Sequence, residues 1–241
     1  MRAVKEFSRF AESYGRYNII QRQVARRLVC DFMPRDPGRL LDLGCGEGEI
    51  FRQLCGRQIP FGRLFAVDLS QKMLKLHPRD KRVQLLQGDF DDPGFLESLE
   101  REKIDTVLSA SALQWSRDLG QTAEALSNIG NRAAFAIFTS GTFRTLHHCA
   151  GTGSPIRSYE TVEAILQQYY EIDRIEKMEY RLGFEDPRAI FRYIKRSGVS
   201  GGEPRLTYRQ IRRLIDSYPL DYLEFELLFF SGRPKRSFSK A

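Results

Sequence analysis

The chain has 241 residues, of which 41% are hydrophobic and 29% charged, and this size and composition predict one α/β domain with a small elaboration. No apolar run approaches the ~20 residues that a membrane helix needs, and the polar N-terminus is not typical of a signal peptide. The four cysteines show no C-x-x-C spacing, which favours reduced thiols and a cytoplasmic location. The net charge of +7 indicates an anionic partner, and charge alone does not choose among a nucleic acid, a membrane surface and an acidic protein.

Residues 5–32 are predicted to form a helix that is interrupted near Tyr14 and Gly15. Apolar side chains recur there at spacings of three and four residues, as on one face of a helix: Phe7, Phe10, Ala11, Tyr14, Tyr17, Ile20, Val24 and Leu28. A helix that precedes the first strand can cross the carboxyl edge of the sheet, where ligands bind in doubly wound folds. Simple core packing is the competing interpretation for Tyr14 and Tyr17.

The segment 39–49, R-L-L-D-L-G-C-G-E-G-E, predicts a buried strand that enters a tight turn and then a helix. Gly44, Gly46 and Gly48 lack a Cβ, so the turn can take positive φ and the backbone can touch a ligand. The spacing G-x-G-x-G differs from the dinucleotide fingerprint, and no P-loop lysine follows it. Because Asp42 precedes the turn, the pattern favours a ligand that joins an adenosine to a cationic amino acid. A tight turn with no ligand is the alternative.

Two further strands are predicted to end in carboxylates. The strand at 64–67 is followed by Asp68, in the position where an acidic residue holds a ribose diol. The strand at 83–87 leads to Asp89 and Phe90, where Asp89 could accept from an adenine amino group and Phe90 could pack on the ring. A helix cap is the alternative role for Asp68.

The remaining pattern completes an α/β fold with a doubly wound, seven-stranded, mostly parallel sheet, an N-terminal helix and a helical cap. Further strands are predicted at 104–108, 133–138, 172–182 and 222–230. Further helices are predicted at 93–101, 119–129, 142–149, 159–169, 187–196 and 207–217. We expect one domain over 1–241, made of an N-terminal helical segment (1–36), a cofactor-binding core (37–141), cap helices (142–171 and 184–218) and last strands (172–183 and 219–232).

The glycine turn with Asp42 resembles the first motif of the class I S-adenosylmethionine-dependent methyltransferases, [D/E]-x-G-x-G-x-G, which have a Rossmann-like fold. Other segments resemble the malonyl-[acyl-carrier protein] O-methyltransferases of biotin synthesis, and this resemblance covers nearly the whole chain. The segments are F-S-R-F-A-E-S-Y-x6-Q-R-Q-V-A (7–25), A-L-Q-W (112–115), G-T-F-R-T-L-H (141–147), F-E-D-P-R (184–188), L-T-Y-R-Q-I (206–211) and Y-P-L-D-Y-L-E-F (218–225).

The resemblance implies methyl transfer from S-adenosylmethionine to the free carboxylate of malonyl-acyl carrier protein, which gives the methyl ester that starts biotin precursor synthesis. It implies cofactor binding by Asp42, Gly44, Cys45, Gly46, Gly48, Asp68, Leu69, Asp89, Phe90 and Ser109. It implies substrate positioning by Tyr14, Gln21, Trp115, Arg144 and His147. Among these, Arg144 is the first candidate for the malonyl carboxylate, because a guanidinium fork matches a carboxylate.

Neither a general base nor a metal ion is expected. A carboxylate acceptor is ionised at neutral pH and needs no base. His147 and His148 are neighbours on a predicted helix, so their side chains diverge by roughly 100° and do not converge on one ion.

The basic surplus is expected to attract the acidic carrier protein, rather than a nucleic acid or a membrane. Two clusters in the predicted cap are candidates: Arg188, Arg192, Lys195 and Arg196, and then Arg209, Arg212 and Arg213. Solvated helix faces are the competing interpretation of both clusters.

Two other functions stay open. A carboxyl methyltransferase that acts on a small free acid or an acyl-CoA ester would share the same core. A non-catalytic methyltransferase-like subunit that binds a partner such as RNA is the second, although the chain shows no RNA-binding module and retains Asp68 and Asp89.

Overall fold

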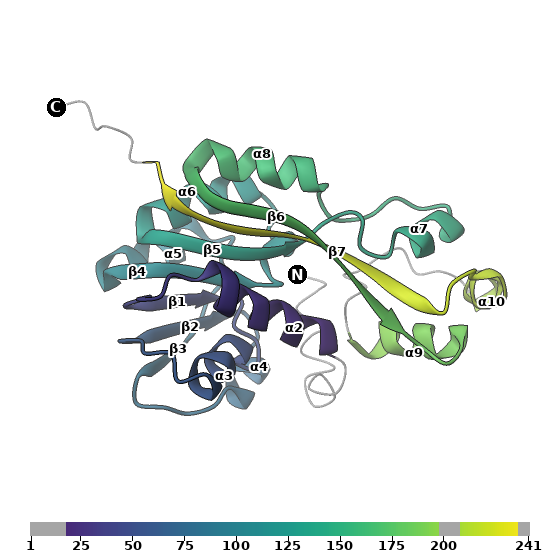
Figure 1. The fold of residues 1–241 in the computed structure, drawn as a ribbon, viewed down its shortest axis with the longest axis horizontal. Coiled ribbons are helices and arrows are strands. Elements are labelled where there is room, and N and C mark those ends of the chain that lie inside the picture. Colours follow the sequence, from purple (N-terminus) through teal and green to yellow (C-terminus); the bar gives the residue numbers. More distant parts are fainter. Residues whose placement is uncertain (1–17, 198–207, 236–241) are drawn as a thin grey trace.

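The computed structural model describes residues 18–197 and 208–235, and within these ranges seven strands form one sheet (Figure 1). The strand order is β3-β2-β1-β4-β5-β7-β6, in which β1 to β5 run parallel and β7 is antiparallel to β5 and β6. The strands are β1 (Leu40–Leu43), β2 (Leu64–Asp68), β3 (Val83–Gln87), β4 (Ile104–Ala110), β5 (Gly130–Phe138), β6 (Tyr170–Gly183) and β7 (Tyr222–Pro234). The predicted α/β fold with a seven-stranded, mostly parallel sheet is confirmed.

Helices cover both faces of the sheet, as expected for parallel strands that are apolar on both sides. Those on one face are α2 (Ile19–Arg27), α3 (Glu49–Gly56) and α4 (Gln71–Leu76). Those on the other face are α5 (Pro93–Leu99), α6 (Leu119–Ile129) and α8 (Tyr159–Tyr169). A π-helical segment η1 (Leu28–Phe32) continues α2, and two short 3-10 helices are η2 (Glu100–Glu102) and η3 (Leu113–Trp115). No helix in the described ranges is long and apolar enough to cross a bilayer.

A smaller group of helices forms a cap at one end of the molecule. These are α7 (Arg144–Ala150), α9 (Pro187–Ser197) and α10 (Tyr208–Ser217), which gather at the ends of β6 and β7 that extend past the other strands (Figure 1). The sequence also placed the helix at 159–169 in the cap, and the structure differs there. The α8 side chains Val162 and Leu166 share a buried cluster with Leu119 and Leu126 of α6, so α8 belongs to the sheet layer.

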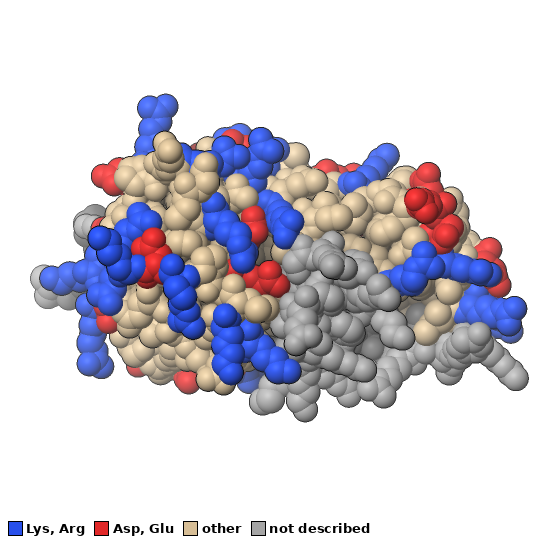
Figure 2. Space-filling view, turned by 90° about the horizontal axis from the view of Figure 1, so that it is seen from below, with Lys and Arg blue, Asp and Glu red and all other residues tan. Residues whose placement is uncertain are grey.

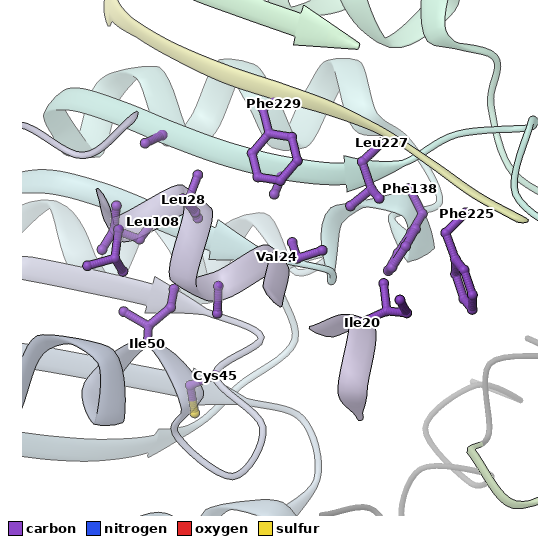
Figure 3. Packing of buried hydrophobic residues seen from close by; sticks show 14 of the residues in the cluster. Ile20, Val24, Leu28, Cys45, Ile50, Leu108, Phe138, Phe225, Leu227 and Phe229 are labelled. Atoms are coloured by element: carbon purple, nitrogen blue, oxygen red, sulfur yellow. The ribbon is translucent and has the colours of Figure 1, made fainter. Parts of the chain in front are cut away.

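The helix α2 lies between the glycine turn and β7 (Figure 3). Its buried residues are Ile20, Val24 and Ala25, and Leu28 continues this face at the start of η1; each is at most 1% exposed. These residues share one hydrophobic cluster with parts of the glycine turn, α3 and β7, including Cys45, Ile50, Leu227 and Phe229. The predicted interruption near Tyr14 and Gly15 lies outside the described residues.

Candidate functional site

The three predicted glycines fill the turn between β1 and α3. Their φ angles are +75° at Gly44, +53° at Gly46 and +85° at Gly48, a region that side chains with a Cβ avoid. The N–H groups of Gly44 and Cys45 both donate to the carbonyl of Val67, at 2.8 and 2.9 Å. The turn is therefore tied to the end of β2.

The outer two glycines are needed for packing, whereas the middle one faces open space. A Cβ at Gly44 would lie 2.2 Å from the Cβ of Ala112, and a Cβ at Gly48 would lie 2.5 Å from the ring of His77. Within the part of the chain that the structure describes, a Cβ at Gly46 would meet nothing within 4 Å. Gly46 is thus the point of the turn at which a ligand can approach the backbone.

The carboxylate of Asp68 joins this turn to the start of α4. Its Oδ2 accepts from the backbone N–H of Gly46 at 2.9 Å, and its Oδ1 accepts from that of Ser70 at 2.7 Å. Burial raises the pKa of Asp68, and these two hydrogen bonds oppose the rise. Each oxygen keeps a second lone pair, so two hydroxyl groups of a ligand can still donate to this side chain.

Asp42 is a buried carboxyl group beside the same turn. It is 1% exposed, and its Oδ2 has no hydrogen-bond partner among the described residues. Burial, and then the charge of nearby Asp68, raise the pKa of Asp42 to about 8. A buried, unpartnered carboxyl oxygen next to an open stretch of backbone fits a ligand that carries a positive charge. The residues of the turn therefore fit an adenosine-bearing cationic cofactor.

Two other residues expected at the cofactor are buried parts of the framework. The Ser109 hydroxyl donates to the carbonyl of Leu43 at 2.8 Å and is fully buried, so this side chain ties β4 to β1. The thiol of Cys45 is 3.7 Å from the carbonyl oxygen of Gly46, and burial is the main reason that its pKa is raised. Through their side chains, these two residues support the turn from within the core.

The predicted adenine contacts follow β3. The Oδ1 of Asp89 accepts from the N–H of Asp91 at 2.9 Å, and its Oδ2 lies 4.0 Å from the guanidinium of Arg117. Phe90 is half-buried against the core beneath α5 and α6. Leu69 is half-buried and lies in the short link between β2, which ends at Asp68, and α4.

Of the residues expected to position the substrate, Tyr14 lies outside the described residues. Gln21, on α2, is half-buried, and its Oε1 has no hydrogen-bond partner within the described ranges. Trp115 ends the turn η3 after β4 and is half-buried. Because β4 and β5 are parallel neighbours, the segments that follow them reach the same edge of the sheet.

Arg144 and His147 lie on α7, after β5. The Nε of Arg144 donates to Glu224 at 3.1 Å and its Nη1 donates to Glu179 at 3.0 Å, so much of its charge is already balanced. His147 is 6% exposed, and burial lowers its pKa, which keeps the ring neutral at pH 7. The guanidinium of Arg144 is thus held by two carboxylates, whereas His147 is an uncharged side chain on the same helix.

The sequence analysis missed two buried carboxylates of β7 that hold the segment 139–145. Glu226 accepts from the Thr139 hydroxyl and, at 3.2 Å, from the N–H of Gly141. Glu224 accepts from the N–H of Thr145 at 3.1 Å and from its hydroxyl at 2.8 Å. In the sequence, these two residues stand out only because they are acidic within a strongly apolar strand. An unpaired charge would be costly there, so this pattern indicates buried partners for both carboxylates.

Replacing Glu226 by alanine is expected to lower the free energy of unfolding by about 2–4 kcal/mol, because Thr139 and Gly141 lose a buried acceptor. Chemical denaturation measures the change. Glu179→Ala is the matched control, since Glu179 is 45% exposed and its pair with Arg144 should contribute less than ~1 kcal/mol. Equal losses in the two variants would contradict a structural role for Glu226.

Comparison with known proteins extends this description. Residues 41–137 match the model of a methyltransferase domain. The chain is 29% identical over 206 residues to a malonyl-[acyl-carrier protein] O-methyltransferase of Bacteroides thetaiotaomicron, with 82% of this chain and 77% of that protein covered. It is 25% identical over 232 residues to the protein of the same name from Acinetobacter baylyi, with 92% and 88% covered.

A solved structure shows the same fold with a cofactor bound. It is that of Haemonchus contortus phosphoethanolamine N-methyltransferase 2 in complex with S-adenosyl-L-methionine, with a TM-score of 0.56 and 15% identity. The match covers 95% of this chain and 57% of that one. Residues 41–137 thus match a methyltransferase domain, and the sheet order, the glycine turn and these relatives support S-adenosylmethionine as its cofactor.

Proposed function

We propose that this protein methylates the free carboxylate of a malonyl group carried as a thioester on acyl carrier protein, and that the product is the methyl ester used to start biotin precursor synthesis. One observation carries the proposal. The similarity to proteins named for this reaction covers 82% and 92% of the chain, whereas the shared methyltransferase domain accounts only for residues 41–137. The likeness therefore includes parts of the N-terminal helix or the cap, which lie outside the common core.

In this proposal the cofactor lies across the glycine turn. The open space at Gly46 admits it, and the Asp68 oxygens accept from its ribose hydroxyls. The buried Asp42 provides negative charge near its cationic amino-acid part, while Asp89 and Phe90 contact the adenine. When bound, S-adenosylmethionine supplies an electrophilic methyl carbon on a positively charged sulfur.

For a carboxylate acceptor, the protein mainly has to position the substrate against the cofactor. A malonyl carboxylate has a pKa near 4 and is already a nucleophile at pH 7, so no side chain has to remove a proton. Orientation of the reacting groups and exclusion of water supply the rate enhancement. Holding the two reactants together can lower the activation barrier by several kcal/mol, with an upper limit of roughly 7–11 kcal/mol. The cap helices α7, α9 and α10 provide such a cover at the end of the sheet.

Arg144 remains the proposed anchor of the malonyl carboxylate. Its Nε and Nη1 are held by Glu224 and Glu179, which fix the guanidinium, and its Nη2 has no partner among the described residues. A fixed and partly neutralised guanidinium can orient a carboxylate without strongly reducing its nucleophilicity. Gln21, Trp115 and the neutral His147 are proposed as the neighbouring walls, together with Tyr14.

The test compares three acceptors under the same conditions: malonyl-acyl carrier protein, malonyl-CoA and free malonate. We expect kcat/KM for the carrier-bound substrate to exceed that for either small acceptor by about tenfold or more, because the carrier adds binding energy remote from the reacting atoms. Equal or faster methylation of malonyl-CoA or malonate would instead support a carboxyl methyltransferase for small acids. No transfer to any of them would contradict the proposed reaction.

A further inference from the structure

We propose that the acidic carrier protein docks on a basic strip formed by α2, α3, α4 and the loops before β2 and β3, beside the glycine turn; this inference rests on the proposed function. The strip is defined by Arg22, Arg52, Arg57, Arg63, Lys72, Lys75, Arg79, Lys81 and Arg82. Figure 2 looks at this side of the molecule from below and shows Lys and Arg side chains spread over the half that carries α3 and α4.

The charge of the whole chain is concentrated in this strip. Residues 52–82 contain eight Lys and Arg but only two acidic residues, so this segment alone carries +6 of the net +7. Asp68 faces the glycine turn, and Asp80 is paired with Arg82 at 2.9 Å, so neither acidic residue is paired with the other cations of the segment. The surface is therefore predominantly positive, which attracts and orients an acidic partner.

Contacts between side chains join the strip into one surface that begins at the glycine turn. Arg22 of α2 and Arg52 of α3 both approach Glu49, the first residue of α3, at 3.9 and 3.6 Å. Farther along, the Arg82 guanidinium lies 4.0 Å from the thiol of Cys55 at the end of α3. A partner docked along this surface would lie next to the site where the cofactor is expected.

Four side chains of the strip are available to a partner. Lys72, Lys75, Arg79 and Lys81 are exposed and have no hydrogen-bond or ion-pair partner among the described residues. A hollow of about 380 Å³ beside β3 is lined by Pro78, Arg79, Asp80, Lys81, Val83 and Leu85 and offers a place for a partner's side chain. Because β3 is an edge strand, no further strand of the sheet covers this hollow within the described ranges.

An acidic protein fits the strip better than a single-stranded nucleic acid. Proteins that bind single strands combine positive charge with aromatic rings on which bases stack. Here the ring of Phe61 is buried and covered by the Arg82 guanidinium at 4.3 Å, so it is not presented to a base. The strip offers charge and a hollow without an exposed stacking surface in the part that the structure describes.

The cap clusters predicted from the sequence are the alternative docking surface. Arg188, Arg192, Arg212 and Arg213 are exposed there. They stand close in sequence to Glu185, Asp186, Asp216 and Asp221, so the cap surface is of mixed charge. The side chains of Lys195, Arg196 and Arg209 lie outside those that the structure describes.

The experiment uses two variants with the same change in charge. The strip variant carries Lys72→Glu, Lys75→Glu, Arg79→Glu and Lys81→Glu, and the cap variant carries Arg188→Glu, Arg192→Glu, Arg212→Glu and Arg213→Glu. Binding of malonyl-acyl carrier protein is measured directly by calorimetry at low and high salt, and KM and kcat are measured with the same substrate. Three controls show whether each variant is folded and has a working catalytic site. They are the affinity for the cofactor, the thermal unfolding temperature, and the rate with malonyl-N-acetylcysteamine, a small thioester that lacks the carrier protein.

For the strip variant we expect Kd and KM for the carrier substrate to rise by about tenfold or more and to lose most of their salt dependence, with kcat and the rate on malonyl-N-acetylcysteamine unchanged. The cap variant should remain within about twofold of the wild type. The proposal is overturned if the strip variant binds the carrier normally or if the cap variant shows the loss instead. Wild-type protein that binds the carrier through the strip but does not methylate it would contradict the proposed reaction and leave the docking surface standing.

Discussion

Replacing Gly46 by alanine is expected to weaken S-adenosylmethionine binding by at least about tenfold while the protein stays folded. The new Cβ would point into the space at the centre of the turn, where no atom of another described residue lies within 4 Å and where we place the cofactor. The φ angle of +53° costs an alanine only about 1 kcal/mol. Isothermal titration calorimetry and thermal unfolding of the same sample measure the two effects.

Gly44→Ala is the matched control in the same turn. Its Cβ would lie 2.2 Å from the Cβ of Ala112, so the turn must shift, and we expect a loss of stability of about 3 kcal/mol or more. The two variants thus separate a ligand contact from a packing contact. If Gly46→Ala bound the cofactor as tightly as the wild type, the cofactor would not lie over this part of the turn.

The affinity for S-adenosylmethionine is expected to rise as the pH rises from 6 to 8. Asp42 has a pKa of about 8 in the protein without cofactor, so it is largely protonated and neutral below that pH. A cationic ligand favours the ionised carboxylate, and binding below pH 8 must therefore release a proton. Calorimetry in buffers of different ionisation enthalpy counts that proton, and Asp42→Asn should remove both the proton release and the pH dependence.

The same carboxyl group should make the cofactor-free protein less stable as the pH rises. A carboxyl with a pKa near 4 when unfolded and about 8 when folded binds more protons in the folded state, so stability falls between pH 4 and pH 8. Asp42→Asn should then be more stable than the wild type above pH 8, by about 3–5 kcal/mol. A cofactor affinity that does not change with pH in the wild type would contradict a contact between Asp42 and the ligand. The absence of any stabilisation by Asp42→Asn would contradict the raised pKa of Asp42.

Much of the fold followed from local patterns. The apolar runs at 64–67 and 83–87 are β2 and β3, and the helix expected at 119–129 is α6. The glycine turn was found because its spacing and the carboxylates at the ends of neighbouring strands are local features. Periodicity does not say which surface a helix covers, and this is why α8 was assigned to the cap when it packs beside α6.

The features that the sequence did not predict depend on contacts between segments that are far apart in the chain. Glu224 and Glu226 bond to residues about 80 positions earlier, and the pairing of β7 with β5 alone brings them together. Arg144 carried a recognisable motif, but its ion pairs with Glu179 and Glu224 become visible only when α7, β6 and β7 are placed together. All residues of the basic strip except Arg22 lie within 52–82, yet the exposure of this surface depends on β3 lying at the edge of the sheet.

The most direct measurement is mass spectrometry of malonyl-acyl carrier protein after incubation with this protein and S-adenosylmethionine. We predict that the carrier gains the mass of one methyl group, and that cleavage of the thioester removes this gain together with the malonyl group. An unchanged carrier mass, in a sample whose cofactor binding has been verified by calorimetry, would contradict the proposed acceptor.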